Sequence, residues 1–469
     1  MRVDGLPLSR FMRVVPAASA VLLCSCGGYG SGSGSPPPAP SISFSAQPST
    51  IVAGQSATLT WSATNATSCT ASGAWSGNQP TSGQMMVAPT AAGTDTYTLT
   101  CADANTGAYS GGATSSSMSV TLTVNAATAF VQKSLVADAA SGTATVDANL
   151  VNPWGIAFLP GHPAWVANNH TETSTLYDGA GVPQPAGNPL TVHLPPTSGG
   201  TPFDPTGIVG NTTTDFVVSA ANKSAAAVFL FTGEGGMIAG WSPNVDATNA
   251  VVMYTDAGGA VYKGLALANN GSGNFLYATD FHNSKVDVFD ATFTRQTPTQ
   301  ARFAFRDAAL PAGFAPFGIQ ALNTGPGGAT QLYVTFAKQQ GPDNHDNANG
   351  AGLGIVDIFD TNGVLVKTLV AAGGALNAPW GVTLAPADFG TLSNTLLVGD
   401  FGDGRINAYD PATGAFKGAL TTASGTFALP GLWGIAFGND AAGQPHNTLF
   451  FAAGTNGEAN GSYGRIDLP

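Results

Sequence analysis

The chain has 469 residues, of which 43 % are hydrophobic and only 9 % charged, and its formal net charge is −12. This length admits two or three domains with sizeable cores, and the hydrophobic content excludes a disordered polypeptide. With 15 Lys and Arg residues, the chain lacks the clustered positive charge that phosphate groups require, so no nucleic-acid partner is expected. The 61 Gly and 31 Pro indicate frequent turns, and the short apolar runs between them predict an all-β protein.

The N-terminus has the parts of a bacterial export signal. Three arginines in the first 13 residues precede a short apolar stretch, residues 14–23, which is too short to span a bilayer permanently. The Leu-Cys-Ser-Cys that follows resembles a lipobox, in which Cys26 fits better than Cys24 because it follows a small residue. This resemblance implies that residues 1–25 are a lipoprotein signal peptide and that acyl chains hold the protein at the outer membrane, facing the periplasm or the surface. An ordinary secretory leader is the alternative.

A flexible linker and a small β-domain are expected next. Residues 26–40 are rich in Gly, Ser and Pro, as is typical of a tether. Residues 41–126 contain short alternating runs that predict half-buried strands of a sandwich, and they include no Lys or Arg. Cys69 and Cys101 are expected to form a disulfide in an oxidising compartment. The block around Trp61 and these cysteines resembles bacterial immunoglobulin-like modules, which implies a spacer, with partner binding as the alternative.

Residues 127–469 repeat a box centred on a glycine, as in Asn-Pro-Trp-Gly-Ile-Ala-Phe at residues 152–158. Six boxes follow one another at intervals of 52 to 63 residues, close to the length of one propeller blade. The box glycines are Gly155, Gly207, Gly264, Gly318, Gly381 and Gly434. An apolar second strand follows each box, and in the second repeat we expect it at residues 215–221. Third strands often end in an aspartate that is expected to accept N–H bonds in the next turn: Asp178, Asp290, Asp360 and Asp410.

These repeats predict a six-bladed β-propeller. The last repeat ends after three strands, so its outer strand is expected to come from residues 129–138, which would close the ring. The boxes resemble those of NHL-type and lactonase-type six-bladed propellers, and more closely those of an uncharacterised family of secreted bacterial propellers. The resemblance covers residues 129–469 and implies a fold and an exported location, but no reaction.

The residues that precede the box glycines are expected to meet at one mouth of the central channel: Trp154, Thr206, Lys263, Phe317, Trp380 and Trp433. In lactonase-type propellers this position often supplies a carboxylate or amide ligand for calcium, but none of the six is acidic, which argues against calcium-assisted lactone hydrolysis. No cofactor is expected. Four aromatic rings and one uncompensated Lys predict an apolar, singly cationic cup for a carbohydrate or a small organic anion. Packing between blades is the alternative. Polar contacts are expected from Asn168, Asn169, Asp280, His282 and Asp400.

Two further sets of polar residues are ambiguous. Asp280 and Asp400 are candidate metal ligands or, more simply, turn caps. The insertion at residues 339–352 holds Asp343, His345 and Asp346, which are either cation ligands or part of a solvated loop. No catalytic motif such as G-x-S-x-G occurs. The sequence therefore favours a cell-envelope lipoprotein whose propeller head binds a ligand or partner at its channel mouth. The alternatives are a propeller hydrolase or lyase and a purely structural or adhesive protein.

Overall fold

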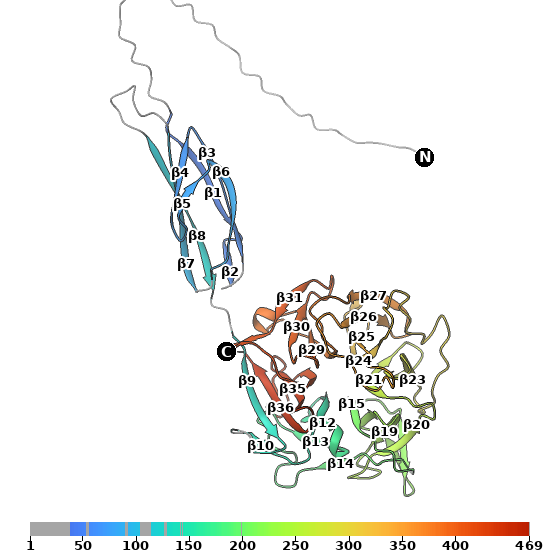
Figure 1. The fold of residues 1–469 in the computed structure, drawn as a ribbon. Coiled ribbons are helices and arrows are strands. Elements are labelled where there is room, and N and C mark those ends of the chain that lie inside the picture. Colours follow the sequence, from blue (N-terminus) through green and yellow to red (C-terminus); the bar gives the residue numbers. More distant parts are fainter. Residues whose placement is uncertain are drawn as a thin grey trace, which may run out of the picture. The chain divides into compact units, whose positions relative to one another are not determined.

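The computed structural model describes residues 38–52, 56–89, 92–103, 114–125, 129–140, 142, 144–197 and 199–468. The expected signal peptide, Cys26 and most of the expected linker lie outside the described residues. The chain divides into two compact units, Met1–Ala127 and Thr128–Pro469, and both are built from β-strands (Figure 1). The helices of the described residues are three short 3-10 turns, η1 (Asn169–Thr171), η2 (Pro326–Gly328) and η3 (Gly390–Leu392). None of the described helices has the length and apolar composition needed to cross a membrane.

The first unit contains two sheets. One has the order β1 (Ser41–Gln47), β3 (Ala57–Thr64), β6 (Ser82–Val87). The other has the order β2 (Thr50–Val52), β8 (Ser115–Asn125), β7 (Gly93–Ala102), β4 (Ser68–Gly73), β5 (Gly77–Gln79). Alternate residues of these strands face a common core that includes the fully buried Leu59, Leu99 and Leu122. The predicted disulfide between Cys69 and Cys101 is present, and it joins directly opposite residues of the neighbouring strands β4 and β7.

The described part of the second unit contains six larger sheets and two small hairpins. In five of the sheets the strands follow the chain from the inner strand outward. The first is β11 (Pro153–Ala157), β12 (Ala164–Asn168), β13 (Thr173–Tyr177), β14 (Thr191–His193), and the second is β15 (Pro205–Gly210), β18 (Phe229–Gly233), β19 (Met237–Trp241), β20 (Val251–Thr255). The third is β21 (Tyr262–Asn269), β22 (Asn274–Asp280), β23 (Lys285–Phe289), the fourth is β24 (Phe314–Leu322), β25 (Gln331–Lys338), β26 (Gly354–Asp360), β27 (Leu365–Val370), and the fifth is β28 (Pro379–Leu384), β29 (Leu396–Asp400), β30 (Ile406–Tyr409), β31 (Phe416–Ala419). The sixth sheet is β34 (Leu432–Phe437), β35 (Leu449–Thr455), β36 (Asn460–Asp467), β9 (Val131–Ala137), β10 (Thr145–Val146). The hairpins are β16 (Val217–Ala220) with β17 (Lys223–Ala226), and β32 (Thr421–Thr422) with β33 (Gly425–Thr426).

The inner strands of these sheets meet in a closed cycle around a common centre (Figure 1). Strand β11 contacts β15, and the contacts continue through β21, β24 and β28 to β34, which contacts β11 again. Sheets whose first strands surround one axis in this way form a β-propeller. The strands are apolar on both faces because each sheet is packed between two others, and five residues in a row of β12 are buried.

The box glycines are required where neighbouring inner strands come closest. A Cβ on Gly318 would lie 2.0 Å from the carbonyl oxygen of Trp380, and one on Gly381 would lie 2.6 Å from that of Trp433. Every box glycine stands in this relation to the backbone of the next box, so the repeated glycine is a consequence of the ring geometry. A side chain at this position would force two sheets apart.

The ring is closed by a strand from the start of the unit, as predicted. Strand β9 pairs antiparallel with β36, and Lys133 stands opposite Arg465. The pairing is reinforced by an ion pair in which Lys133 Nζ lies 2.8 Å from Asp467 Oδ2. The last sheet therefore contains both the first and the last long strand of the propeller, and β36 has no open edge.

In the second repeat, the prediction for the second strand was wrong. Residues 217–220 form β16, which pairs only with β17 in a separate hairpin. The strand that pairs with the inner strand β15 is β18. Strand β16 alternates between exposed and buried residues, whereas all five residues of β18 are buried. The hairpin is thus an insertion on the surface, and its β-branched sequence resembled an interior strand only in composition.

The aspartates at the ends of third strands cap turns, as predicted. The Oδ1 atom of Asp178 accepts the N–H groups of Ala180 and Val182, each at 2.9 Å. The same double contact, at 2.9 to 3.1 Å, is made by the other three, Asp290, Asp360 and Asp410.

Candidate functional site

The aromatic residues of the boxes meet at the channel mouth, but they are packed and not exposed. The rings of Trp154 and Trp433 stack with their centroids 3.4 Å apart, and Trp380 lies edge-on to both. Phe317 packs beside Trp433, and the exposed fractions of the four residues are between 0 and 9 %. The expected open aromatic cup is therefore absent, and the rings pack against one another as part of the core. The rings close the channel and form a floor beneath this mouth.

Hydrogen bonds fix the position of this floor, which consists of Trp154, Phe317, Trp380 and Trp433. Trp380 donates its indole N–H to the carbonyl oxygen of Lys263 at 2.9 Å, and Trp433 donates to Asn152 Oδ1 at 3.1 Å. Thr206, the second-repeat member of the same ring, donates its hydroxyl to the carbonyl oxygen of Tyr262 at 2.8 Å and is fully buried. Since these groups are engaged within the protein, they serve the packing of the propeller and do not face a ligand.

Lys263 was expected to be an uncompensated cation, and this expectation was wrong. Its side chain is only 3 % exposed, and its ammonium forms an ion pair with Glu234 in the turn between β18 and β19. The same nitrogen lies 3.8 Å from Asp346 Oδ1 and 5.4 Å from the centroid of the Trp154 ring. Two carboxylates and an aromatic face thus compensate the buried charge, as a buried ammonium requires.

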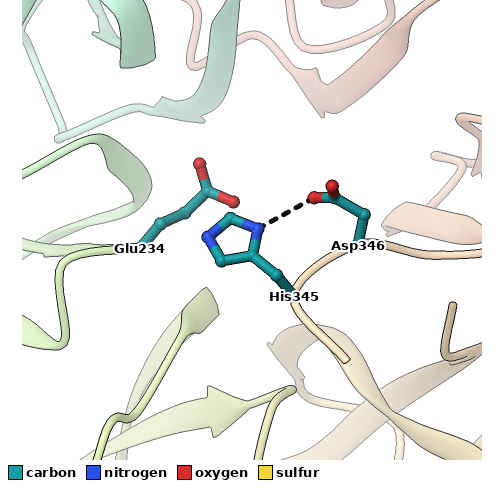
Figure 2. Close-up of side chains that lie close together, drawn as sticks. All are labelled: Glu234, His345 and Asp346. Carbon is teal, nitrogen blue, oxygen red and sulfur yellow. Dashed lines mark hydrogen bonds and ion pairs between the residues drawn. The ribbon is translucent and has the colours of Figure 1, made fainter. Parts of the chain in front are cut away.

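The loop at residues 339–352 reaches over the floor from the fourth sheet. It is held by a hydrogen bond from the N–H of Gln340 to the carbonyl oxygen of Asp346 at 2.8 Å. Figure 2 shows that His345 and Asp346 of this loop lie beside Glu234, which comes from the second sheet, with His345 Nδ1 2.9 Å from Asp346 Oδ1. Asp343, the third predicted ligand of this loop, is not part of this group in the described part of the chain, and its carbonyl oxygen lies 2.7 Å from His282 Nδ1.

These three side chains are the right types for a divalent cation. One ligand atom each from Glu234, His345 and Asp346 lies within 4.8 Å of the others. Carboxylate and imidazole ligands suit transition metals such as zinc or manganese. The ammonium of Lys263 already contacts both carboxylates, however, so a metal ion and this ammonium would compete for the same oxygens.

A second pair of carboxyl groups lies close by. The carboxylate of Glu172 accepts the N–H groups of Phe203 at 2.9 Å and Asp204 at 3.1 Å. Burial, together with the neighbouring carboxyl of Asp204, raises the pKa of Glu172 to about 7. Burial also raises the pKa of Asp204, and the negative charge of Glu234 acts in the same direction. The two carboxyls therefore tend to share one proton near neutral pH.

The third glutamate of the chain completes this group. Burial raises the pKa of Glu458, and the negative charge of Glu234 adds to the effect. Asn169 connects the group to the floor, since its Nδ2 donates to Glu234 Oε2 at 3.0 Å and its Oδ1 accepts from Asn152 at 3.3 Å. We call this end of the channel the charged mouth, defined by Glu172, Asp204, Glu234, Lys263, His345, Asp346 and Glu458.

Of the five polar residues expected around the mouth, only Asn169 contacts these groups. Asn168 is buried and donates to Thr173 and Thr175 within its own sheet. Asp280 caps a turn and accepts the N–H groups of Val261 and Asn283, each at 3.2 Å. The other two lie apart: His282 contacts the loop backbone, and Asp400 accepts from Asn407 Nδ2 at 2.7 Å.

The sequence contained a signal for the missed residues. The chain has only three glutamates, and each follows the second strand of its sheet: Glu172 after β12, Glu234 after β18 and Glu458 after β35. These turns belong to three consecutive sheets and lie at one end of the channel. Glu172 and Glu458 also adopt the left-handed backbone conformation, with φ of 56° and 69°. Glycine adopts this conformation with less strain, as Gly404 does in the chain.

Comparison with known proteins places the chain among uncharacterised relatives. It is 32 % identical over 344 residues to Uncharacterized protein R648 of Acanthamoeba polyphaga mimivirus, which covers 71 % of this chain and 78 % of the relative. It is 31 % identical over 332 residues to Uncharacterized protein L690 of the same virus, with 68 % and 81 % covered. No protein-family model matches the chain.

Solved structures resemble the chain only distantly. A streptogramin B lyase structure has 12 % identity and a TM-score of 0.40, over 73 % of this chain and 98 % of that one. A putative gluconolactonase has 14 % identity and a TM-score of 0.39, over 72 % and 92 %. These likenesses do not bear on activity. The sequence relatives are viral, whereas the resemblance of the boxes had indicated a bacterial family. The chain belongs to the family of β-propeller proteins that includes the uncharacterised mimivirus proteins R648 and L690.

Proposed function

We propose that this protein is a cell-envelope lipoprotein, anchored through Cys26, whose propeller head binds a positively charged ligand at the charged mouth. Six sheets in a closed cycle support a six-bladed propeller, and the two sheets of the first unit support an immunoglobulin-like stalk. The export signal and the lipobox support the location.

The observation that carries this proposal is the convergence of all three glutamates of a charge-poor chain on one mouth. Lys263 is neutralised by Glu234, and Asp346 pairs with His345, so Glu172, Asp204 and Glu458 remain as acidic groups that form no ion pair within the described residues. The raised pKa values of Glu172, Asp204 and Glu458 reflect burial without enough positive charge nearby. A bound cation would supply that charge. A carbohydrate or an organic anion, the ligands expected from the sequence, fits this mouth less well, since the aromatic rings are covered and the charge is negative.

The test is a calorimetric titration of the full chain with Zn²⁺, Mn²⁺, Ca²⁺ and choline. Binding is expected to be tighter at pH 8 than at pH 5.5, because protons on Glu172 and its neighbours compete with the cation. Glu234→Gln is expected to weaken binding at least tenfold. Asp388→Asn removes the same charge from an exposed site and serves as the matched control. The proposal fails if none of the probes binds or if both variants behave alike.

Lys263 provides a second test of a cation at Glu234, His345 and Asp346. Lys263→Met keeps an unbranched side chain that lacks only the terminal ammonium, and it frees the oxygens of Glu234 and Asp346. If the ligand is a divalent metal at Glu234, His345 and Asp346, this variant is expected to bind it more tightly than the unaltered protein. Weaker binding would contradict a cation at this site, because removing an ammonium beside a bound cation relieves repulsion.

A propeller hydrolase or lyase is the second candidate, and the pair of Glu172 and Asp204 favours it. A carboxyl whose pKa is about 7 can donate a proton at neutral pH while a nearby carboxylate accepts one. The enzyme would be supported by turnover of lactones or glycosides whose rate changes with a pKa near 7 and is lost in Glu172→Gln. Cation binding without turnover would support the binding protein.

A further inference from the structure

The two ends of the propeller channel differ completely in charge. At the end opposite the charged mouth, the channel widens into a cavity of about 580 Å³. Among the described residues that line this cavity there is no Asp, Glu, Lys, Arg or His. The cavity is continuous with the narrow channel, since Ile156, Ile208 and Ile435 line both. We call this end the uncharged mouth. Its volume falls in the range of about 300–1,000 Å³ that is typical of small-molecule sites.

One side of the uncharged mouth presents aromatic rings. Phe158 follows the inner strand β11 and Phe437 ends the inner strand β34, and these two strands are neighbours in the ring. Both side chains are half-buried. Each is held from behind by a fully buried ring, Phe158 by Phe450 at 5.6 Å and Phe437 by Phe389 at 4.8 Å between centroids. The rings are therefore fixed in position while part of their surface faces the cavity.

The other side of the uncharged mouth presents polar groups without partners. Gln320 on β24 and Thr383 on β28 occupy the same position of their boxes, two residues after the glycine. Neither side chain makes a hydrogen bond within the described part of the chain. Gln320 is exposed and lines both the channel and the cavity. Gln320 thus stands across the cavity from Phe158, and Thr383 lies on the strand next to that of Phe437, so that an amide and a hydroxyl with free hydrogen-bonding capacity share the cavity with two fixed aromatic rings.

We propose that the uncharged mouth binds a neutral saccharide. A sugar ring has an apolar face of C–H groups that stacks on aromatic rings and an edge of hydroxyls that pairs with amides and hydroxyls. Phe158 and Phe437 would take the apolar face, and Gln320 and Thr383 would bind the hydroxyls. A charged sugar would lose hydration without gaining a partner, and an acyl chain would leave Gln320 buried and unpaired. This site is independent of the cation proposed at the opposite end.

The test is binding of neutral saccharides to the full chain, measured by calorimetry with glucose, galactose, N-acetylglucosamine, maltose and cellobiose. At least one is expected to bind. Gln320→Ala and Thr383→Val are each expected to weaken this binding at least fivefold while leaving the melting temperature within about 2 °C, since neither side chain has a protein partner. Glu234→Gln, at the other end of the channel, is the matched control and is expected to leave saccharide binding unchanged.

Hydrogen exchange locates the bound saccharide independently of the variants. Protection is expected in residues 319–323 and 382–385, at the uncharged mouth, and not in the loop at 339–352. The proposal is overturned if none of the five saccharides binds, or if saccharide binding is lost in Glu234→Gln and kept in Gln320→Ala. Binding that protects the loop at 339–352 would likewise refute it, and would place the saccharide at the charged mouth.

Discussion

A Cβ on Gly434 would lie 2.4 Å from the carbonyl oxygen of Trp154, so the last box and the first meet through backbone atoms at the seam of the ring. The same relation links every consecutive pair of boxes. The six glycines therefore set the diameter of the channel. Four of them are directly preceded by an aromatic residue, and these aromatic rings fill the channel at one end.

Gly318→Ala is expected to destabilise the head by about 1–3 kcal/mol or more, because the added methyl group would lie 2.0 Å from a backbone oxygen that cannot move alone. Gly273→Ala is the control, since the nearest atom to its Cβ is 3.7 Å away. Urea unfolding of the two variants measures the difference. Equal midpoints would show that the inner strands can separate without cost.

Trp433→Ala is expected to cost about 3–5 kcal/mol, as truncation of a buried aromatic side chain does. Trp433 is 2 % exposed and touches the rings of Trp154, Phe317, Trp380 and Phe401. Phe416→Ala removes a 53 % exposed ring from an outer strand and is expected to change the melting temperature little. If both variants melted alike, the floor of the charged mouth would not be part of the core.

The unfolding free energy of the head is expected to fall as the pH rises from about 5 to 9. Burial raises the pKa of Asp400 to about 8 and that of Asp357 to about 7, above the value near 4 of an unfolded aspartate. Such a group binds its proton more tightly in the folded state. Its contribution to the free energy of unfolding is therefore complete below about pH 4 and is lost as the pH rises through its folded pKa.

Asp400→Asn tests this pH dependence. The amide stays neutral at every pH, and Asn407 can still donate to its oxygen. Thermal melts between pH 6 and pH 9 are expected to vary less in this variant than in the unaltered protein, with the exposed Asp388→Asn as the control. A slope that Asp400→Asn does not reduce would mean that other groups govern the stability.

Cys69→Ala with Cys101→Ala is expected to destabilise the first unit by roughly 3–4 kcal/mol. The disulfide closes a loop with a sequence separation of 32, and the chain-entropy relation gives this magnitude. Melting of the first unit with and without reductant measures it. The propeller is expected to melt unchanged, because the disulfide lies within the first unit, and a shift in its transition would contradict this expectation.

Cys26→Ser is expected to release the protein from the membrane fraction or to block its processing, because the acyl chains would supply the membrane affinity. Fractionation of cells that express the two forms is the measurement. A variant that remains in the membrane fraction like the unaltered protein would refute the lipobox interpretation.

The architecture of the head was predictable because it leaves a periodic trace in the sequence. The glycine at each contact between inner strands recurs in all six boxes, and the closing strand was recognisable because the last repeat was one strand short. The second repeat was misread for a local reason. The surface strand β16 begins with two valines after Phe216, an apolar run of the kind found in interior strands, and only pairing with β15 distinguishes β18 from it.

The charged mouth was less predictable because its groups come from distant parts of the chain. Lys263 was correctly placed at the mouth, but its partner Glu234 lies in a turn of another sheet, and nothing local connects the two. Aromatic residues in the boxes also fit two outcomes equally well, exposure in a cup or packing in a floor. The choice depends on the channel diameter, which no single repeat encodes.

The closure of the ring has a consequence for synthesis. Lys133 of β9 leaves the ribosome early, and its partner Asp467 follows 334 residues later. At about 5–20 residues per second, β9 waits on the order of 15–70 seconds for β36. Throughout this time the edge of β9 that will meet β36 is unpaired and open to pairing with another chain. Lys133 therefore has a second role besides its ion pair with Asp467, because a charged side chain on an exposed edge strand opposes aggregation.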